Sequence, residues 1–231
     1  VKAMANEFGG DTFSDVRQML DQAKPDALLV CTPPFVRLEP IQTACERKLP
    51  FFCEKPPAFS LEDAHKVLKV IEGSGVPHSI GFMYRHKETT DRVKELLQGQ
   101  TLVAVRSTFV CGAILNPDFP AWFKLQDKSG GPMLDQAIHV MDTLRYVVGE
   151  ITRVFALGSN RATVRGPSVT VNDTLNLALE FEGGLGGTHN HSWATRPFVC
   201  VYELLLKDGW LRVDLTGANC LTGELRGMKI E

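Results

Sequence analysis

The chain has 231 residues, enough for one large or two modest domains, and 44% of them are hydrophobic, which can fill a core. Its net charge is −2 with both signs interspersed, which excludes the basic surface typical of nucleic-acid-binding proteins. No apolar stretch approaches the roughly 20 residues that a membrane-spanning helix needs. We therefore expect a globular protein with neither nucleic acid nor membrane as a partner.

The first part of the chain alternates between helices and short apolar strands. Helices are expected over residues 15–23, 38–47 and 60–72, and strands over residues 27–31, 51–53 and 78–83. Ser60 and Asp63 fit a capping box at the start of the third helix, and the Gly-Ser-Gly of residues 73–75 closes it. This βαβα alternation predicts a parallel, doubly wound sheet.

The pattern changes near residues 85–90, and we place a domain boundary after residue 86. Two helices are expected beyond it, over residues 88–97 and 134–148. Strands dominate the rest, over residues 102–110, 151–157, 174–181, 186–192, 201–207 and 210–214. Residues 87–231 are therefore expected to form an α+β domain with a mostly antiparallel open sheet, and residues 227–231 end it without an obvious closing element.

The six cysteines are spread along the chain and form no Cys-x-x-Cys pair: Cys31, Cys45, Cys53, Cys111, Cys200 and Cys220. This spacing argues against a zinc ribbon or a thioredoxin-like motif, so no metal is expected. We expect reduced thiols in a cytoplasmic protein.

Polar, proline-rich segments follow two successive strands of the predicted parallel sheet. Thr32-Pro33-Pro34 follows the first strand, and Glu54-Lys55-Pro56-Pro57 follows the second. Ligands of open α/β sheets bind outside the carboxyl ends of the strands, and prolines hold such turns in extended shapes. The alternatives are a plain loop at Thr32 and a solvated lysine at Lys55.

A second candidate group lies in the helix expected over residues 134–148. Asp135 and His139 are four residues apart, which places both on one helix face. A carboxylate beside a histidine suits general acid–base catalysis. The alternatives are a carboxylate that complements the helix N-terminus and a packed histidine.

The order and spacing of these motifs resemble the Gfo/Idh/MocA family of nicotinamide-dependent oxidoreductases. The resemblance covers almost the whole chain and is most specific over residues 27–58 and 129–149. Its motifs are Thr32-Pro33, Glu54-Lys55-Pro56, Tyr84-Arg85, Trp122, and Ser129-Gly130-Gly131 with Asp135 and His139.

The resemblance implies NAD or NADP as the cofactor and a sugar-like or polyol-like alcohol or ketone as the substrate. Thr32 and Pro33 are similar to the turn that packs against the cofactor. Glu54 is similar to a neighbour of the nicotinamide ribose. Lys55 resembles the family's active-site lysine, which hydrogen-bonds both substrate and cofactor.

Asp135 and His139 resemble the family's dyad near the substrate, with His139 exchanging the hydroxyl proton. The same resemblance implies a homo-oligomer assembled through the C-terminal sheet. Arg85, at the domain junction, is expected to be structural. His189 and His191 are two residues apart on one strand face, and packing or a subunit interface is expected there, because a metal site would need a third ligand.

Two features depart from the family pattern. Arg37 stands where the family usually has a histidine, which changes a cofactor-side contact or its charge preference. The family's opening strand, Gly-x-Gly-x-x-Gly turn and second strand have no counterpart, so residues 1–86 are expected to be the remainder of a Rossmann domain without its first βαβ unit, with impaired cofactor binding. The rival interpretation is a catalytically silent binding or regulatory protein on the same fold, and a weaker one is a related reductase that acts on a non-sugar carbonyl or a pigment.

Overall fold

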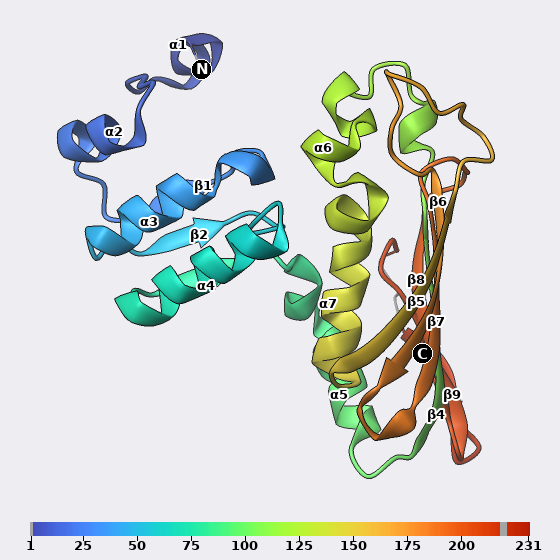
Figure 1. Cartoon of the computed structure of the whole chain (residues 1–231). Helices are drawn as coiled ribbons and strands as arrows, with labels where there is room; N and C mark the ends of the chain where they lie inside the picture. The colour runs from blue at the N-terminus through green and yellow to red at the C-terminus, as the bar shows by residue number, and fades with distance from the viewer. Residues whose placement is uncertain (1, 218–220) are drawn as a thin grey trace. The chain divides into compact units, whose positions relative to one another are not determined.

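The structure is a computed structural model that describes residues 2–217 and 221–231 (Figure 1). Cys220 lies outside the described residues, and the other five cysteines are free thiols. The chain divides into two compact units, Val1–Gly81 and Phe82–Glu231, a few residues before the boundary expected at residue 86. Within the described ranges, no helix combines the length and the apolar character needed to cross a membrane.

The first unit contains a three-stranded parallel sheet in the order β1-β2-β3, which confirms the predicted architecture. Its strands are β1 (Leu28–Val30), β2 (Phe51–Cys53) and β3 (His78–Ile80). Leu28 lies opposite Phe51, and Phe51 opposite His78, so the carboxyl ends of all three strands meet at one edge. The third strand ends before residue 83, because the chain turns at Gly81 and enters the 3₁₀ turn η2 (Met83–His86).

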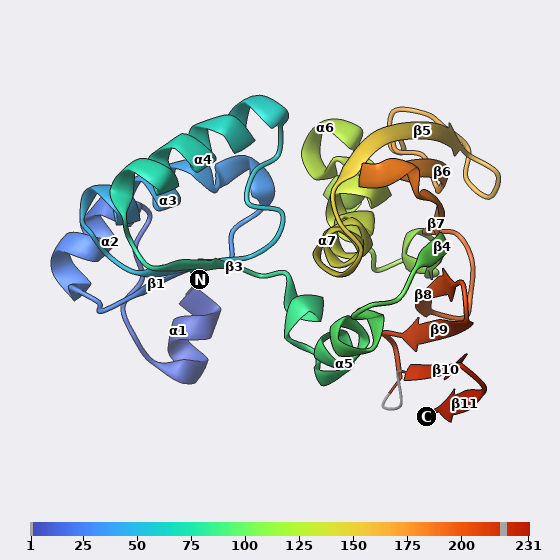
Figure 2. The same ribbon diagram turned by 90° about the horizontal axis from the view of Figure 1, so that it is seen from below.

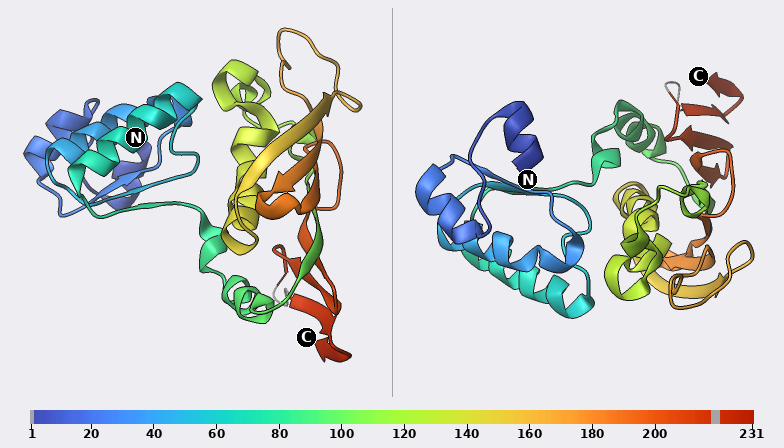
Figure 3. Two further views of the ribbon diagram at one scale, coloured as in Figure 1. Left: turned by 60° about the horizontal axis from the view of Figure 1, so that its bottom comes forward. Right: turned by 90° about the horizontal axis from the view of Figure 1, so that it is seen from above.

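Four helices accompany this sheet: α1 (Lys2–Phe8), α2 (Val16–Ala23), α3 (Leu38–Glu46) and α4 (Leu61–Ser74). Figure 2 shows α2, α3 and α4 on one face of the sheet and α1 on the other, and Figure 3 agrees. The predicted N-cap is present, since Ser60 Oγ accepts a hydrogen bond of 3.1 Å from the Asp63 N–H. Between sheet and helices lies a core that includes Val30, Ile41, Ala44, Phe51, Cys53 and Val67.

The second unit contains an eight-stranded sheet in the order β11-β10-β9-β8-β4-β7-β6-β5. Its strands are β4 (Leu102–Val110), β5 (Ile151–Ser159), β6 (Thr174–Phe181), β7 (Gly186–Ser192), β8 (Val199–Leu206), β9 (Gly209–Asp214), β10 (Leu221–Leu225) and β11 (Met228–Ile230). Every pairing is antiparallel except that of β4 with β7, so the expected mostly antiparallel sheet is confirmed.

Two details of the second unit differ from the prediction. The short turns between the later strands indicate an antiparallel meander, but β4 lies between β7 and β8 and pairs with both. The chain also ends in a hairpin of β10 and β11 that was not expected. Gly223 weakens the strand pattern of β10 in the sequence, because glycine is unfavourable inside strands. The structure requires glycine there, since a Cβ at this position would lie 2.3 Å from the Trp210 carbonyl oxygen.

Helices α5 (Glu88–Leu97), α6 (Gln126–Ser129) and α7 (Ile138–Val147) lie along one face of this sheet (Figure 1). Three short turns lie between β4 and α7: η3 (Ala113–Leu115), η4 (Ala121–Lys124) and the π-helical turn η5 (Met133–Ala137). A further turn, η6 (Glu182–Gly184), connects β6 to β7. Val140 and Leu144 of α7 pack against the sheet in a core that also includes Val93, Val105, Leu177, Leu204 and Leu211. No helix among the described residues covers the opposite face.

The long connection from β5 to β6 is held by one buried carboxylate. Asp173 accepts hydrogen bonds from the backbone N–H groups of Arg161, Ala162 and Thr163, at 3.2, 3.0 and 2.8 Å. Its side chain also accepts from the Thr163 hydroxyl at 2.9 Å. Burial by itself would raise the pKa of this carboxyl, but these hydrogen bonds hold it below the usual value.

Replacing Asp173 by Asn should therefore lower the free energy of unfolding at pH 7 by about 1–3 kcal/mol, because the donors of residues 161–163 lose a charged acceptor. A carboxyl whose folded pKa is lowered stabilises the fold above its unfolded pKa of about 3.9, and this contribution is lost as the pH falls through the folded value. Urea unfolding at pH 7 and at pH 3 measures both effects. Asp127→Asn, at an exposed position of the same unit, is the control; equal stability of both variants at pH 7 would contradict the assignment.

Candidate functional site

The carboxyl edge of the first unit's sheet gathers the residues that the sequence predicts for cofactor binding. Thr32 and Pro33 follow β1 and are exposed, ahead of the 3₁₀ turn η1 (Pro34–Val36). Glu54 and Lys55 follow β2 and are half-buried. Glu54 Oε2 accepts a hydrogen bond of 3.1 Å from the Lys55 N–H, so the acidic side chain folds back onto the backbone of the lysine.

The third strand contributes a glycine that the sequence analysis did not identify. A Cβ at Gly81 would lie 3.2 Å from both carboxylate oxygens of Glu54 and 3.1 Å from Phe52 Cζ. These distances are tighter than ordinary van der Waals contact, so a larger residue would displace the carboxylate. Gly81 therefore lets Glu54 lie close against the end of β3.

Arg37 connects the two loops that follow β1 and β2. Its Nε donates to the Thr32 carbonyl at 2.7 Å, and its Nη1 donates to the Glu54 carbonyl at 2.5 Å and also to the Pro56 carbonyl. The residue is only 5% exposed. The cation that replaces the family's histidine thus binds main-chain carbonyls of this unit, a role that the sequence alone did not suggest.

A cavity of about 350 Å³ lies beside β1, the edge strand of the described sheet. Apolar side chains of β1 and α2 form much of its wall, and Leu29 in the middle of β1 is 71% exposed. The lining residues are Phe13, Ser14, Asp15, Val16, Met19, Leu28, Leu29, Val30, Thr32, Val36, Glu39 and Pro40.

In the second unit, His139 lies in the first turn of α7 and is buried between two aromatic rings. The ring centroid of Tyr84 is 5.3 Å away, tilted by 54°, and that of Phe82 is 6.4 Å away, nearly perpendicular. Burial raises the pKa of the Tyr84 hydroxyl, and a hydrogen bond joins this hydroxyl to the Cys200 thiol. The imidazole therefore lies in an ordered, largely apolar surrounding.

Asp135 lies in the π-helical turn η5 that leads into α7, which corrects the single α-helix expected over residues 134–148. Because a π turn is wider than an α turn, the four-residue spacing does not by itself place Asp135 and His139 on one face. Gln136 joins this turn to the residues that follow β4 and β7. Its Oε1 accepts hydrogen bonds from Trp193 Nε1 at 2.6 Å and from Cys111 Sγ at 3.3 Å. Gln136 was not identified from the sequence, because its partners are distant along the chain.

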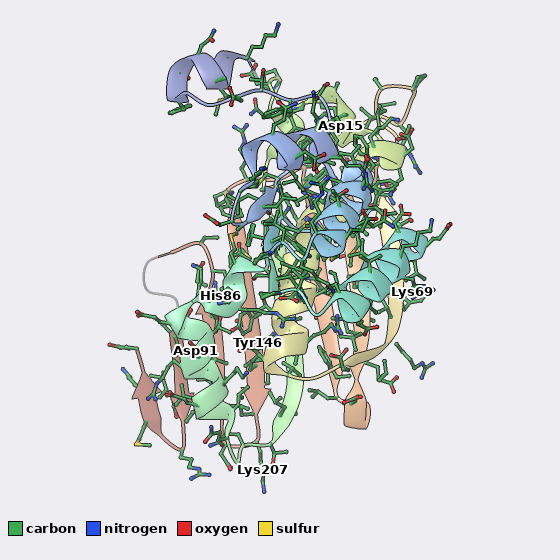
Figure 4. The ribbon with its side chains drawn as sticks, turned by 90° about the vertical axis from the view of Figure 1, so that its left-hand side faces the viewer. Asp15, Lys69, His86, Asp91, Tyr146 and Lys207 are labelled. Atoms are coloured by element: carbon green, nitrogen blue, oxygen red, sulfur yellow. The ribbon has the colours of Figure 1, made fainter. Side chains whose placement is uncertain are left out.

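Arg85 has the structural role that was expected of it. Its guanidinium donates to both carboxylate oxygens of Asp142 on α7, at 2.7 and 2.5 Å. Its Cζ also lies 4.8 Å from the ring centroid of Tyr146, which Lys94 Nζ approaches to 3.7 Å. Figure 4 shows Tyr146 on α7 together with His86 of η2 and Asp91 of α5. These contacts hold η2, with Tyr84, against the helix that carries His139.

The histidine pair of β7 is packed inside the second unit. His189 Nδ1 lies 2.9 Å from Ser107 Oγ, His189 Nε2 lies 3.4 Å from His191 Nδ1, and the His191 ring stacks on Phe109. Burial lowers the pKa of His189 to about 4, and burial together with His189 lowers that of His191 to about 3, so both are neutral at pH 7. Over the described ranges, no three His, Cys, Asp or Glu side chains are grouped so that they could hold a metal ion.

Trp122 stacks on Phe123 with ring centroids 3.8 Å apart, beside a small core that contains Trp193. The structure thus collects Thr32, Pro33, Glu54 and Lys55 at one sheet edge of the first unit. It places Asp135 and His139 in consecutive turns of the second unit.

Family models match both units. Residues 1–82 match "Oxidoreductase family, NAD-binding Rossmann fold", and residues 90–212 match "GFO/IDH/MocA C-terminal domain". The chain is 29% identical over 172 residues to the uncharacterized oxidoreductase YrbE of Bacillus subtilis, which covers 74% of this chain and 50% of that protein. It is 26% identical over 194 residues to myo-inositol 2-dehydrogenase of Thermotoga maritima, covering 83% and 57% respectively.

The chain thus spans about half the length of these curated relatives. A solved structure of levoglucosan dehydrogenase in complex with NADH and levoglucosan has the same fold, with a TM-score of 0.86 at 24% identity over 97% of this chain and 64% of that one. With both units matched by the family models, the chain belongs to the Gfo/Idh/MocA family of oxidoreductases, whose N-terminal domain is an NAD-binding Rossmann fold.

Proposed function

We propose that the chain acts in an NAD(P)-dependent dehydrogenase that moves a hydride between the nicotinamide cofactor and a sugar-like or polyol-like alcohol or ketone. The observation that carries this proposal is the ordered Glu54-Lys55 pair at the carboxyl edge of three parallel strands, beside the exposed Thr32-Pro33 turn. The names of the relatives support it, since one is a myo-inositol dehydrogenase and another a levoglucosan dehydrogenase crystallised with NADH.

The side chains at this edge suit a nicotinamide nucleotide. Thr32 offers a hydroxyl, Glu54 a carboxylate and Lys55 an ammonium group, which together can hydrogen-bond ribose hydroxyls and the oxygen of a substrate. Gly81 has no side chain that would displace the Glu54 carboxylate, so this acceptor keeps its place at the edge. Thr32, Pro33, Glu54 and Lys55 would hold the cofactor, which supplies the hydride acceptor or donor.

Lys55 has the role of holding the substrate oxygen. An ammonium group that donates to this oxygen stabilises the negative charge that develops as the hydroxyl loses its proton. Because the Lys55 N–H is itself bonded to Glu54 Oε2, the backbone from which the lysine side chain extends is fixed.

His139 has the role of general base in the oxidation direction. The imidazole takes the proton of the substrate hydroxyl, and the Asp135 carboxylate stabilises the imidazolium that results. The rings of Phe82 and Tyr84 exclude water from one side of the imidazole and restrict its rotation. In the reduction direction, the same imidazole returns the proton to the carbonyl oxygen.

A catalytically silent binding protein on the same fold is the rival class. Such a protein would retain the Glu54-Lys55 loop for its shape alone, so its turnover would not depend on the lysine amine. Assays of variants at Lys55 and His139 separate the two classes.

Lys55→Ala should lower turnover at least about 100-fold, because a positioned charge at the reacting oxygen is lost. The assay follows NADH or NADPH formation by its absorbance with a panel of polyols and sugars, and circular dichroism checks that the fold survives. Lys69→Ala removes an exposed lysine of the same unit, on α4 (Figure 4), and should leave turnover unchanged. Near-wild-type turnover of Lys55→Ala would refute the role of the amine.

His139→Gln should lower kcat for alcohol oxidation by about 10²–10⁴-fold, because general base catalysis is lost. His86→Gln, at an exposed histidine of the same unit, is the matched control. If Lys55 and His139 act on one hydroxyl, the loss in the double variant should be far smaller than the product of the two single losses. Fully multiplicative losses would contradict a shared reacting group.

We also propose that the uncovered face of the second unit's sheet pairs two copies of the chain. Phe155 and Leu157 on β5 are 64% and 59% exposed. They lie opposite Ala178 and Asn176 of β6, whose neighbours Leu177 and Leu179 point into the core. Because side chains alternate along a strand, Phe155 and Leu157 are on the face away from the helices. A self-complementary apolar surface of this kind suits a twofold dimer.

Phe155→Glu should shift the protein toward the monomer, because a paired interface would bury the new carboxylates. Sedimentation velocity over a range of protein concentrations measures the change. Val164→Glu introduces the same charge at an apolar position that is 89% exposed in the β5–β6 connection, and it should leave the oligomeric state as it is. A wild-type chain that sediments as a monomer at all concentrations would overturn the proposal.

A further inference from the structure

Arg37 is a buried cation that donates hydrogen bonds to carbonyl groups of two different loops. The Thr32 carbonyl lies in the loop after β1, and the Glu54 and Pro56 carbonyls lie in the loop after β2, 17 and 19 residues after Arg37. An arginine presents several N–H donors in one rigid plane, so a single guanidinium can hold several acceptors in fixed relative positions. Arg37 therefore joins both cofactor-side loops at the carboxyl edge.

The prolines of these two loops explain why a side-chain hydrogen-bond donor is needed there. Pro33, Pro34, Pro56 and Pro57 have no N–H group, so these loops have few backbone donors of their own. Buried carbonyls without a donor cost free energy. The guanidinium supplies the missing donors, and its placement at 5% exposure shows that the contacts are internal to the unit.

The peptide groups around Lys55 are held from both sides. The carbonyl oxygen of Glu54 accepts from Arg37 Nη1, and the N–H of Lys55, in the same peptide group, donates to Glu54 Oε2 at 3.1 Å. One residue further on, the Pro56 carbonyl is again bonded to Arg37. The backbone on either side of Lys55 is thus tied to a single guanidinium.

We propose that Arg37 is a positioning residue that fixes the direction in which Lys55 is presented, by fastening the Glu54–Pro56 backbone to the Thr32 turn. This inference rests on the proposed function of Lys55 as the group that holds the substrate oxygen. The role requires the planar, multiple-donor geometry of the guanidinium, and a positive charge alone does not fulfil it. A displacement of the lysine by about 1 Å is enough to cost on the order of 10²-fold in rate.

The test compares Arg37→Lys, Arg37→Met and Arg37→Ala in the full 231-residue chain. Arg37→Lys keeps the charge and should still lose about 10–100-fold in kcat at saturating cofactor and substrate, as Arg37→Met does. Millimolar guanidinium chloride should restore part of the kcat of Arg37→Ala, and sodium chloride at the same ionic strength should not. Arg47→Met, which removes an arginine paired with Asp21 in the same unit, should keep the wild-type kcat.

A second readout is independent of catalysis. Hydrogen exchange of the ligand-free protein should be faster in the Arg37 variants at the amides of Val36 and Lys55, with the core strands unchanged. Arg37→Lys with wild-type kcat and wild-type exchange would overturn the inference, even if Arg37→Met failed to fold. If the wild-type chain turns over no substrate, the proposed function fails, and the exchange data alone decide whether Arg37 holds the loops.

Discussion

The parallel register of β1, β2 and β3 is the constraint on which the first unit's site depends. Leu28, Phe51 and His78 lie side by side, so each strand ends at the same edge and delivers its following loop there. The evenly spaced backbone hydrogen bonds of the parallel pairs hold this alignment. The polar residues at the start of each loop lie at one edge, because a shift of a strand along its neighbour would remove its apolar side chains from the core.

In the second unit, α7 is held in two ways, by apolar packing against the sheet and by a buried ion pair. Val140 and Leu144 bury one side of α7, while Asp142, on the same helix, receives both hydrogen bonds of Arg85. A buried carboxylate is costly unless it is paired, and the bidentate guanidinium offsets that cost. The pair therefore secures η2, and with it the aromatic surrounding of His139, at a specific position on the helix.

Much of this fold follows from local sequence patterns, and what was missed depends on distant contacts. The bounds of α5, β4, β6 and β7 equal those expected, because strong periodicity and glycine turns mark them. The parallel pairing of β4 with β7 is non-local, and no local pattern encodes it. The π turn before α7 and the partners of Gln136 likewise arise from packing against the sheet.

The candidate site shows the same division. The residues of the Thr32 and Glu54-Lys55 loops could be selected from the sequence, because ligands of open α/β sheets bind at the carboxyl ends of the strands. Arg37 could be recognised only as an unusual residue, since its acceptors become its neighbours once β1 and β2 pair. Gly81 was missed for a similar reason, because its requirement arises from the Glu54 carboxylate of another loop.

The geometry of the lysine loop depends on contacts that lie on one side of β1. Arg37 and Glu54 hold the backbone on either side of Lys55, and their hydrogen bonds join the loops that follow β1 and β2. On its other side, β1 is the edge strand of the described sheet and lies beside a cavity of about 350 Å³, with Leu29 largely exposed. The hydrogen bonds of Arg37 and Glu54 do not involve that edge, so a change beyond β1 should leave the shape of the lysine loop unaltered.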